Sequence, residues 1–245
     1  MRQDIATVVW KEWRTLTQGR SRRQLLLIGG VLALEALIFP IQDPRGWVSD
    51  PVLLGVLGII MPLLVVSVVV PDAIAGERER HTLATLLASR LPAGAILAGK
   101  LGFAVATGWL AGVLMLAVAL VVANVVAGAS PPLLYDSGTL LAVLVLGLLV
   151  AILSGGIAFF VSLRATTAQE AQQLTGVGMM LPIFIGSAIL MVLAGNENLR
   201  TMLEGVLTLD PRLILVGVMG AIALVDGVLL WAADRRFRRG RLLTR

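Results

Sequence analysis

The sequence contains no cysteine and only one histidine among its 245 residues. Without cysteine the chain forms no disulfide, no thiolate metal site and no iron–sulfur cluster, and it has no cysteine nucleophile. The single histidine, His81, excludes a histidine pair for a metal ion and leaves no evident Ser/His/Asp constellation. We therefore expect no catalytic site, and no metal ion or cofactor bound by this chain.

Charge is also scarce. Charged residues make up 14% of the sequence, where about 25% is usual for a soluble domain. The nine apolar residue types reach 58%, and the mean hydropathy is +0.92. Most helix surfaces therefore lack a solvated face and must contact lipid or each other. This composition excludes an ordinary soluble enzyme and predicts an all-α integral membrane protein in a lipid bilayer.

Uncharged stretches locate the membrane spans, because a helix of about 20 apolar residues crosses the hydrocarbon core. Four stretches are long and free of charge, and two further apolar segments carry one acid each, Glu35 and Asp226. We expect both acids to face protein or water, since a charge at a helix centre is costly in lipid. The prediction is one transmembrane domain with six spans, at 25–41, 52–71, 101–127, 139–163, 174–195 and 213–233.

The distribution of Lys and Arg gives the orientation of these spans. Seventeen of the 20 basic residues fall on the side that carries both termini, and only Arg45, Arg200 and Arg212 fall on the other. Basic residues are enriched on the cytoplasmic side of membrane proteins, so both termini are predicted to lie inside a cytoplasmic (inner) membrane. The basic tail 234–245 follows a span directly, which favours contact with anionic headgroups over nucleic-acid binding.

The N-terminal segment 1–24 is polar with helical periodicity and does not resemble a cleavable signal peptide. Its apolar residues, including Trp13, share one helix face, and Lys11 lies opposite. Such a helix is expected to lie in the cytoplasmic interface. Glu12 projects from the apolar face, and two explanations stay open: a salt bridge to a neighbouring span, or exposure to water.

Three fragments imitate an ATPase. The segment 94–100 has the spacing of a phosphate-binding P-loop, but Leu101 occupies the position where a hydroxyl must bind magnesium. The segments 153–156 and 221–226 resemble an ATPase signature and a magnesium-binding strand, yet both lie within predicted spans. We therefore expect the chain itself not to hydrolyse ATP.

The loop between the second and third spans is the most informative segment. Leu83, Leu86 and Leu87 follow an i, i+3, i+4 pattern, and four charged residues at 77–80 precede them. This pattern predicts a short amphipathic helix with a charged end. The helix could rest on lipid headgroups or dock a cytoplasmic partner, and the spacing does not decide between the two.

At these residues the sequence resembles the ABC-2 type permeases, the membrane subunits of a class of ATP-binding-cassette exporters. The shared pattern comprises Gly76-Glu77-Arg78-Glu79, Thr82-Leu83, Leu86-Leu87 and Gly99-Lys100. Lys11-Glu12, Leu181-Pro182 and the six-span layout are also similar to the family. Three positions depart from it: His81 stands where such permeases often have Gly, Ala84 where they often have Glu, and Arg90 where they often have Pro.

The resemblance implies a permease that pairs with a second permease copy, identical or different, and forms the export route along the dimer interface. A separate ATPase subunit, carrying ATP and Mg, would seat against a coupling helix within 72–100. The resemblance implies the following docking residues: Glu77, Arg78, Glu79, Arg80, Thr82, Leu83, Leu86 and Leu87.

Two other functions were weighed against this one. A proton- or ion-coupled secondary transporter would use Glu35 and Asp226, but such proteins commonly show internal repeats, and we find no convincing repeat here. A membrane-embedded enzyme would need a polar cluster within the membrane, and the sequence contains none.

Overall fold

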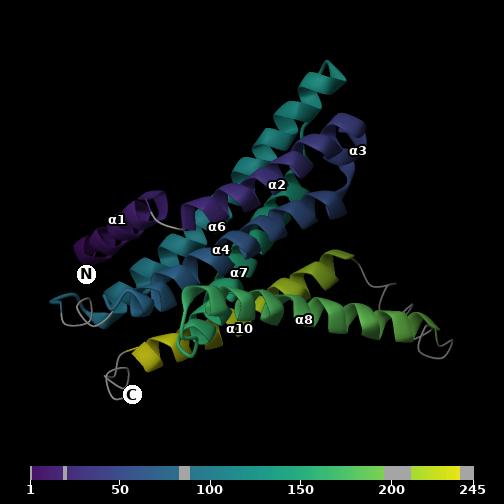
Figure 1. Cartoon of the computed structure of the whole chain (residues 1–245). Helices are drawn as coiled ribbons and strands as arrows, with labels where there is room; N and C mark the ends of the chain where they lie inside the picture. Colours follow the sequence, from purple (N-terminus) through teal and green to yellow (C-terminus); the bar gives the residue numbers. More distant parts are fainter. Residues whose placement is uncertain (1, 19–20, 83–88, 196–210, 238–245) are drawn as a thin grey trace.

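The computed structural model of the chain describes residues 2–18, 21–82, 89–195 and 211–237 (Figure 1). The described residues form helices and short connections, with no strand among them, which confirms the all-α prediction. The helices are α1 (Arg2–Gln18), α2 (Ser21–Gln42), α3 (Pro44–Ser49), α4 (Pro51–Glu79), α6 (Ala93–Ala127), α7 (Ser137–Ser162), α8 (Ala168–Gly195) and α10 (Pro211–Phe237).

Four helices in the described part of the chain are long and apolar enough to cross a membrane: α4, α6, α7 and residues Leu215–Arg236 of α10. The other two predicted spans coincide with parts of α2 and α8. Both are helices of more than 20 residues, so the count of six spans stays a prediction. The chain is a multi-pass helical protein.

Helix α4 runs without a break from Pro51 to Glu79. The sequence predicted the span to end at residue 71 and a cytoplasmic segment to begin at Asp72. Where the helix continues, the charge of Asp72 is paired about two turns later, with Arg80 Nη1 3.3 Å from Asp72 Oδ1. Helix α6 likewise begins at Ala93, so Lys100 lies inside a helix and not in a loop.

On the side opposite the termini, aspartates cap the helices that follow the loops. Asp50 caps α4, accepting a 2.8 Å hydrogen bond from the amide of Val52, and Asp136 caps α7 through the amide of Thr139 at 2.8 Å. These carboxylates satisfy amides that have no partner within the helix. Helix α6 ends at Gly128, whose φ of +54° is the left-handed conformation that glycine adopts readily.

Helices α4, α6 and α7 cross at glycines. A Cβ atom added to Gly147 would lie 2.6 Å from the carbonyl oxygen of Gly58, and one added to Gly108 would lie 3.0 Å from that of Pro62. The backbones of the three helices are therefore in direct contact. The stripe of small residues that includes Gly108 and Gly112 packs within the chain against α4.

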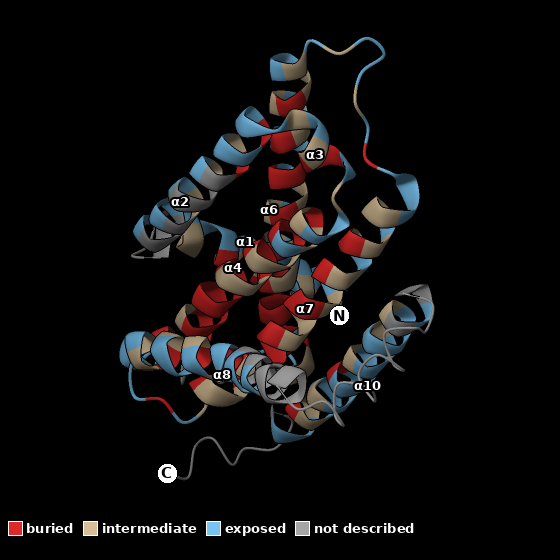
Figure 2. Cartoon of the chain, turned by 90° about the vertical axis from the view of Figure 1, so that its right-hand side faces the viewer, coloured by how far each residue is buried: buried red, intermediate tan, exposed pale blue. Residues whose placement is uncertain are grey.

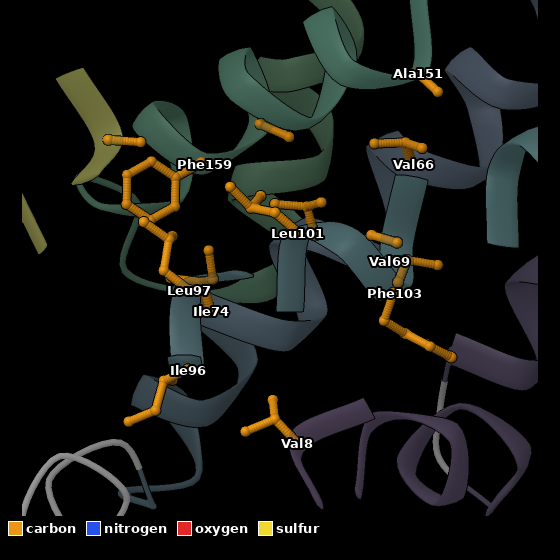
Figure 3. Packing of buried hydrophobic residues seen from close by; sticks show 14 of the residues in the cluster. Val8, Val66, Val69, Ile74, Ile96, Leu97, Leu101, Phe103, Ala151 and Phe159 are labelled. Atoms are coloured by element: carbon orange, nitrogen blue, oxygen red, sulfur yellow. The ribbon is translucent and has the colours of Figure 1, made fainter. Parts of the chain in front are cut away.

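Burial differs between the two parts of the molecule. Buried residues concentrate on α4, α6 and α7, while α8 and α10 are largely exposed or half-buried (Figure 2). In Figure 1, α8 and α10 run at an angle to α2, α4 and α6, and their far ends diverge from the ends of those helices. At the end of the molecule that carries the N-terminus, α1 covers the start of α6, where Val8 and Ile96 belong to the same apolar cluster (Figure 3).

Candidate coupling site where α1 meets α4 and α6

Four charged side chains from three helices meet where α1 lies on α4 and α6. Lys100 Nζ lies 2.6 Å from Glu12 Oε1 and 3.0 Å from Glu77 Oε1, and it donates a 2.7 Å hydrogen bond to the carbonyl of Ala73. Lys11 Nζ pairs with the same Glu77 oxygen. We call Lys11, Glu12, Glu77 and Lys100 the charge cluster.

The charge cluster is neutral as a whole and largely buried. Glu12, Glu77 and Lys100 are 4%, 3% and 3% exposed. Removing one partner from such a group leaves an uncompensated buried charge, so each cluster member depends on the others. Burial lowers the pKa of Lys11, and the nearby Lys100 lowers it further, while Glu12 acts in the opposite direction.

Two glycines make this arrangement possible. A Cβ atom on Gly99 would lie 2.7 Å from the Val8 side chain, so glycine at 99 lets α1 approach α6 closely enough for Lys100 to reach Glu12. A Cβ atom on Gly76 would lie 2.7 Å from Asp72 Oδ1 and 3.0 Å from Arg80 Nη2. Glycine at 76 therefore leaves room for the pair that ends α4.

The two residues after Glu77 bind the turn between α7 and α8. Arg78 donates hydrogen bonds to the carbonyls of Ala165 at 2.9 Å and Leu163 at 3.2 Å. A cation beside these carbonyls, which lie just after the end of α7, is favoured by the helix dipole. Glu79 Oε2 accepts a 3.2 Å hydrogen bond from the amide of Ala168, the first residue of α8, where an anion is favoured for the same reason.

A backbone hydrogen bond to a carbonyl of α4 closes the end of this helix. The amide of Thr82 donates to the carbonyl of Glu77 at 2.9 Å, and His81 adopts a φ of +57°. This left-handed conformation is one that glycine adopts at little cost and a residue with a Cβ does not. The departure of His81 from the family pattern thus falls on a position whose backbone suits glycine.

The segment 77–80 therefore contacts four other helices or their ends. Glu77 holds α1 and α6, Arg78 holds the end of α7, and Glu79 holds the start of α8. Arg80 pairs with Asp72 on the preceding turns of α4. We call these four residues the junction. A force applied to the loop after Arg80 would be passed through it to α1, α6, α7 and α8.

The predicted docking residues are placed unevenly. Arg78 is half-buried, and Glu79, Arg80 and Thr82 are exposed, whereas the carboxylate of Glu77 points into the chain. The burial of Glu77 leaves its carboxylate no surface to offer a partner. The predicted apolar docking face formed by Leu83, Leu86 and Leu87 lies outside the described residues.

The three predicted residues of the interface helix, Lys11, Glu12 and Trp13, also differ in their contacts and exposure. Glu12, for which two explanations were open, forms the salt bridge to a neighbouring span, and that span is α6. Lys11 joins the same cluster. Trp13 is 56% exposed, as an interfacial anchor would be in a structure that contains no lipid.

The two intramembrane acids lie on helices far apart in sequence. Glu35 is part of α2, and its side chain lies outside the described residues. Asp226 is on α10, is 4% exposed, and neither of its carboxylate oxygens has a hydrogen-bond partner among the described residues.

The sequence did not predict that Lys100 and Arg78 hold helices together. Lys100 entered only as half of the Gly-Lys pattern, although it is a single charge at the start of a long uncharged run, which itself signals a buried ion partner. Arg78 carried no signal of its own, because its acceptors are backbone carbonyls more than 80 residues away in sequence.

Comparison with protein families gives a match over most of the described helices. Residues 42–209, more than half of the chain, match the family model described as ABC-2 family transporter protein, which confirms the resemblance. The matched segment contains the junction and Lys100 but not α1, so Lys11 and Glu12 lie outside it. No curated protein matches the chain.

Proposed function

Because the chain belongs to the ABC-2 family of transporter proteins, we propose that it forms the export pathway of an ABC transporter and is driven by a separate cytoplasmic ATPase. Members of this family are membrane subunits for transport, so the chain is a permease of an ABC transporter. The direction of transport, the ATPase subunit and a second permease copy are the parts that we propose.

The observation that carries the proposal is the junction. Three of its four consecutive charged residues contact four other helices or their ends, immediately before the loop that the resemblance assigns to the ATPase. Packed helices switch between discrete arrangements and do not deform continuously. Movement of the docked loop would therefore shift α1, α6 and the α7–α8 turn together.

The burial of Glu77 refines the docking surface. We assign Glu77 to the internal charge cluster and propose that the partner contacts the exposed side of the segment, at Glu79, Arg80 and Thr82, together with the apolar face of Leu83, Leu86 and Leu87. Arg78 acts from behind this surface by holding the end of α7.

The ATPase supplies the nucleotide chemistry in this proposal. Leu101, at the position where a P-loop needs a hydroxyl, lies within the buried apolar cluster around α6. ATP and Mg are accordingly assigned to the partner, and the chain purified alone should not turn over ATP. Activity that survives in such a preparation and disappears with Lys100→Ala would contradict the assignment.

The test is retention of the ATPase by the tagged permease, purified in mild detergent from its native membrane. We expect the wild-type preparation to hydrolyse ATP, and Leu83→Glu with Leu87→Glu to lose at least 90% of that activity because charges replace the apolar docking face. Thr7→Glu, which adds an acid at an exposed position of α1, is the matched control. Equal activity in the double variant would contradict docking at this loop.

One observation favours a second function, an ion- or proton-coupled secondary transporter. The buried, unpartnered carboxylate of Asp226 has the character of an ion-binding group in the membrane. Under the exporter proposal, Glu35→Gln and Asp226→Asn leave ATP-driven transport in place. Transport that runs on an imposed proton gradient without ATP and stops in either variant would favour the second function.

A further inference from the structure

A crevice lies between α6, α7 and α10, near the cytoplasmic end of the predicted spans. It has a volume of about 210 Å³, and its walls are almost wholly apolar, with Leu97 and Leu101 on one side and Leu230 on the other. Figure 3 shows Leu97 and Leu101 pointing toward α7, with Leu97 beside Phe159. An apolar cavity of about 150 Å³ stays dry and takes apolar guests, so the crevice suits a hydrocarbon and not water.

Small residues create this crevice. A Cβ atom on Gly102 would meet nothing within 4 Å, whereas one on Gly156 would lie 3.0 Å from Leu229. Helix α10 is therefore held close to α7 at Gly156, while an open channel remains beside Gly102 on α6. A larger side chain at 102 would enter empty space and would not displace protein atoms.

Two arginines, Arg235 and Arg236, follow Leu230 in the last turns of α10. The guanidinium of Arg236 lies 5.4 Å from the ring centre of Phe160, and that of Arg235 lies 3.9 Å from the ring centre of Trp231. Both arginines are exposed, and Asp234 is half-buried on the same helix end. Leu230 lies six residues before Arg236, or about 9 Å along the helix axis.

That spacing matches a phospholipid whose chain lies in the apolar region and whose phosphate lies at the headgroup level. Trp and Arg side chains at the end of a span commonly mark this level. Basic residues beside the membrane surface attract anionic lipids. A smooth helix face offers no such pocket, so the crevice bounded by α6, α7 and α10 distinguishes this site from ordinary contact with lipid.

We propose that this crevice binds one acyl chain of an anionic phospholipid from the cytoplasmic leaflet, with the lipid phosphate held by Arg235 and Arg236. The bound chain would fill the space between α6 and α10 that the protein leaves open. This site does not depend on the transport function, because its walls and its cations are present whatever the chain carries.

Binding is measured by native mass spectrometry of the delipidated chain in detergent. The probes are palmitoyl-oleoyl phosphatidylglycerol, the phosphatidylcholine with the same chains, and dihexanoyl phosphatidylglycerol. We expect the long-chain anionic lipid to bind about tenfold more tightly than the phosphatidylcholine, since two arginines near a membrane surface have an effect of this order or larger. The short-chain lipid should bind at least tenfold more weakly, because it cannot fill the crevice.

Two variants and a control separate the parts of the site. Gly102→Leu should weaken long-chain phosphatidylglycerol at least tenfold by filling the crevice, and leucine favours the helix more than glycine does. Arg235→Gln with Arg236→Gln should remove the preference for phosphatidylglycerol over phosphatidylcholine. Gly220→Leu, on an exposed part of α10 with open space around it, should change neither value.

Unchanged binding in Gly102→Leu, with the folded fraction confirmed by circular dichroism, would overturn the site. Equal binding of the two headgroups to the wild-type chain would overturn its anionic character. A loss of the same size in Gly220→Leu and Gly102→Leu would show general lipid coating of the helices and would also overturn the proposal.

Discussion

Among the residues that the structure describes, buried charges occur at two places, and their surroundings are opposite. In the charge cluster, Glu12, Glu77 and Lys100 lie within 3.0 Å of an opposite charge. On α10, Asp226 is equally buried at 4% exposure, yet neither of its oxygens has a partner in the described part of the chain. A paired buried charge fixes the positions of the helices that supply it, whereas an unpaired one fixes nothing.

The difference assigns different roles to the two places. The charge cluster joins α1, α4 and α6 and belongs to the framework that, in the proposed function, would transmit movement from a partner ATPase. Asp226 is buried on a helix that is otherwise mostly exposed (Figure 2), and its carboxylate holds no other helix in the described part of the chain.

The largest effect should come from breaking the charge cluster. Lys100→Met keeps most of the side-chain length but leaves Glu12 and Glu77 buried beside Lys11 alone, so we expect a loss of about 3–5 kcal/mol in the free energy of unfolding. The measurement is denaturant unfolding in detergent micelles. Adding Glu12→Gln to Lys100→Met should recover part of the loss, because it removes one unpaired charge. No recovery would show that Lys100 and Glu12 are not coupled.

A smaller loss should follow from removing the contact between α4 and the end of α7. Arg78→Gln gives up two charge-assisted hydrogen bonds to the carbonyls of Leu163 and Ala165, and we expect about 1.5–3 kcal/mol of destabilisation. Arg164→Gln, an exposed arginine in the same turn, is the control and should change stability by less than about 0.5 kcal/mol. Equal effects of the two substitutions would contradict the capping role.

The unpaired acid should behave differently from the paired ones. Asp226→Asn removes a buried charge that has no compensating contact, so stability should rise or change by less than about 1 kcal/mol. The same unfolding experiment measures it. A loss as large as that of Lys100→Met would show that Asp226 has an essential partner, and the contrast between the two places would fail.

The smallest change in stability should come from a substitution that alters no buried charge. His81→Gly relieves a left-handed backbone at the end of α4 and should stabilise the chain by up to about 1 kcal/mol. His81→Ala keeps the Cβ atom and is the matched comparison, expected to give no gain. A thermal melt in detergent distinguishes them, and equal stabilisation by glycine and alanine would show that the backbone conformation is not the cause.

Much of the fold was accessible from the sequence because its signals are local. Uncharged runs predicted the positions of α4, α6, α7 and α8, and an apolar run with one acid, Asp226, predicted the position of α10. The sequence did not reveal that the helices α4 and α6 continue beyond the predicted spans, to Glu79 and back to Ala93, since Asp72 and Lys100 mark the edges of the uncharged runs. Their charges are neutralised by Arg80 and by the charge cluster, and such distant pairing leaves no local pattern.

The site was predicted in outline, and its internal arrangement was not. The sequence placed Glu77 in a docking segment, because acids at the edge of a helix usually face solvent. The glycines at 76 and 99 bring backbones close enough for Glu77 to turn inward toward Lys100. That geometry depends on the approach of α1 to α6, which periodicity within one helix cannot reveal.

The central claim is that the charge cluster makes α1 move with the cytoplasmic end of α4. The natural chain has no cysteine, so Thr7→Cys on α1 and Ser89→Cys in the loop, both at exposed positions, can carry one spin-label pair for electron–electron distance measurement in the ATPase complex. We predict that the distance stays the same with and without ATP in the otherwise unchanged chain, and that it broadens or shifts with ATP when Lys100→Met is added. A distance that changes with ATP equally in both backgrounds would contradict the claim.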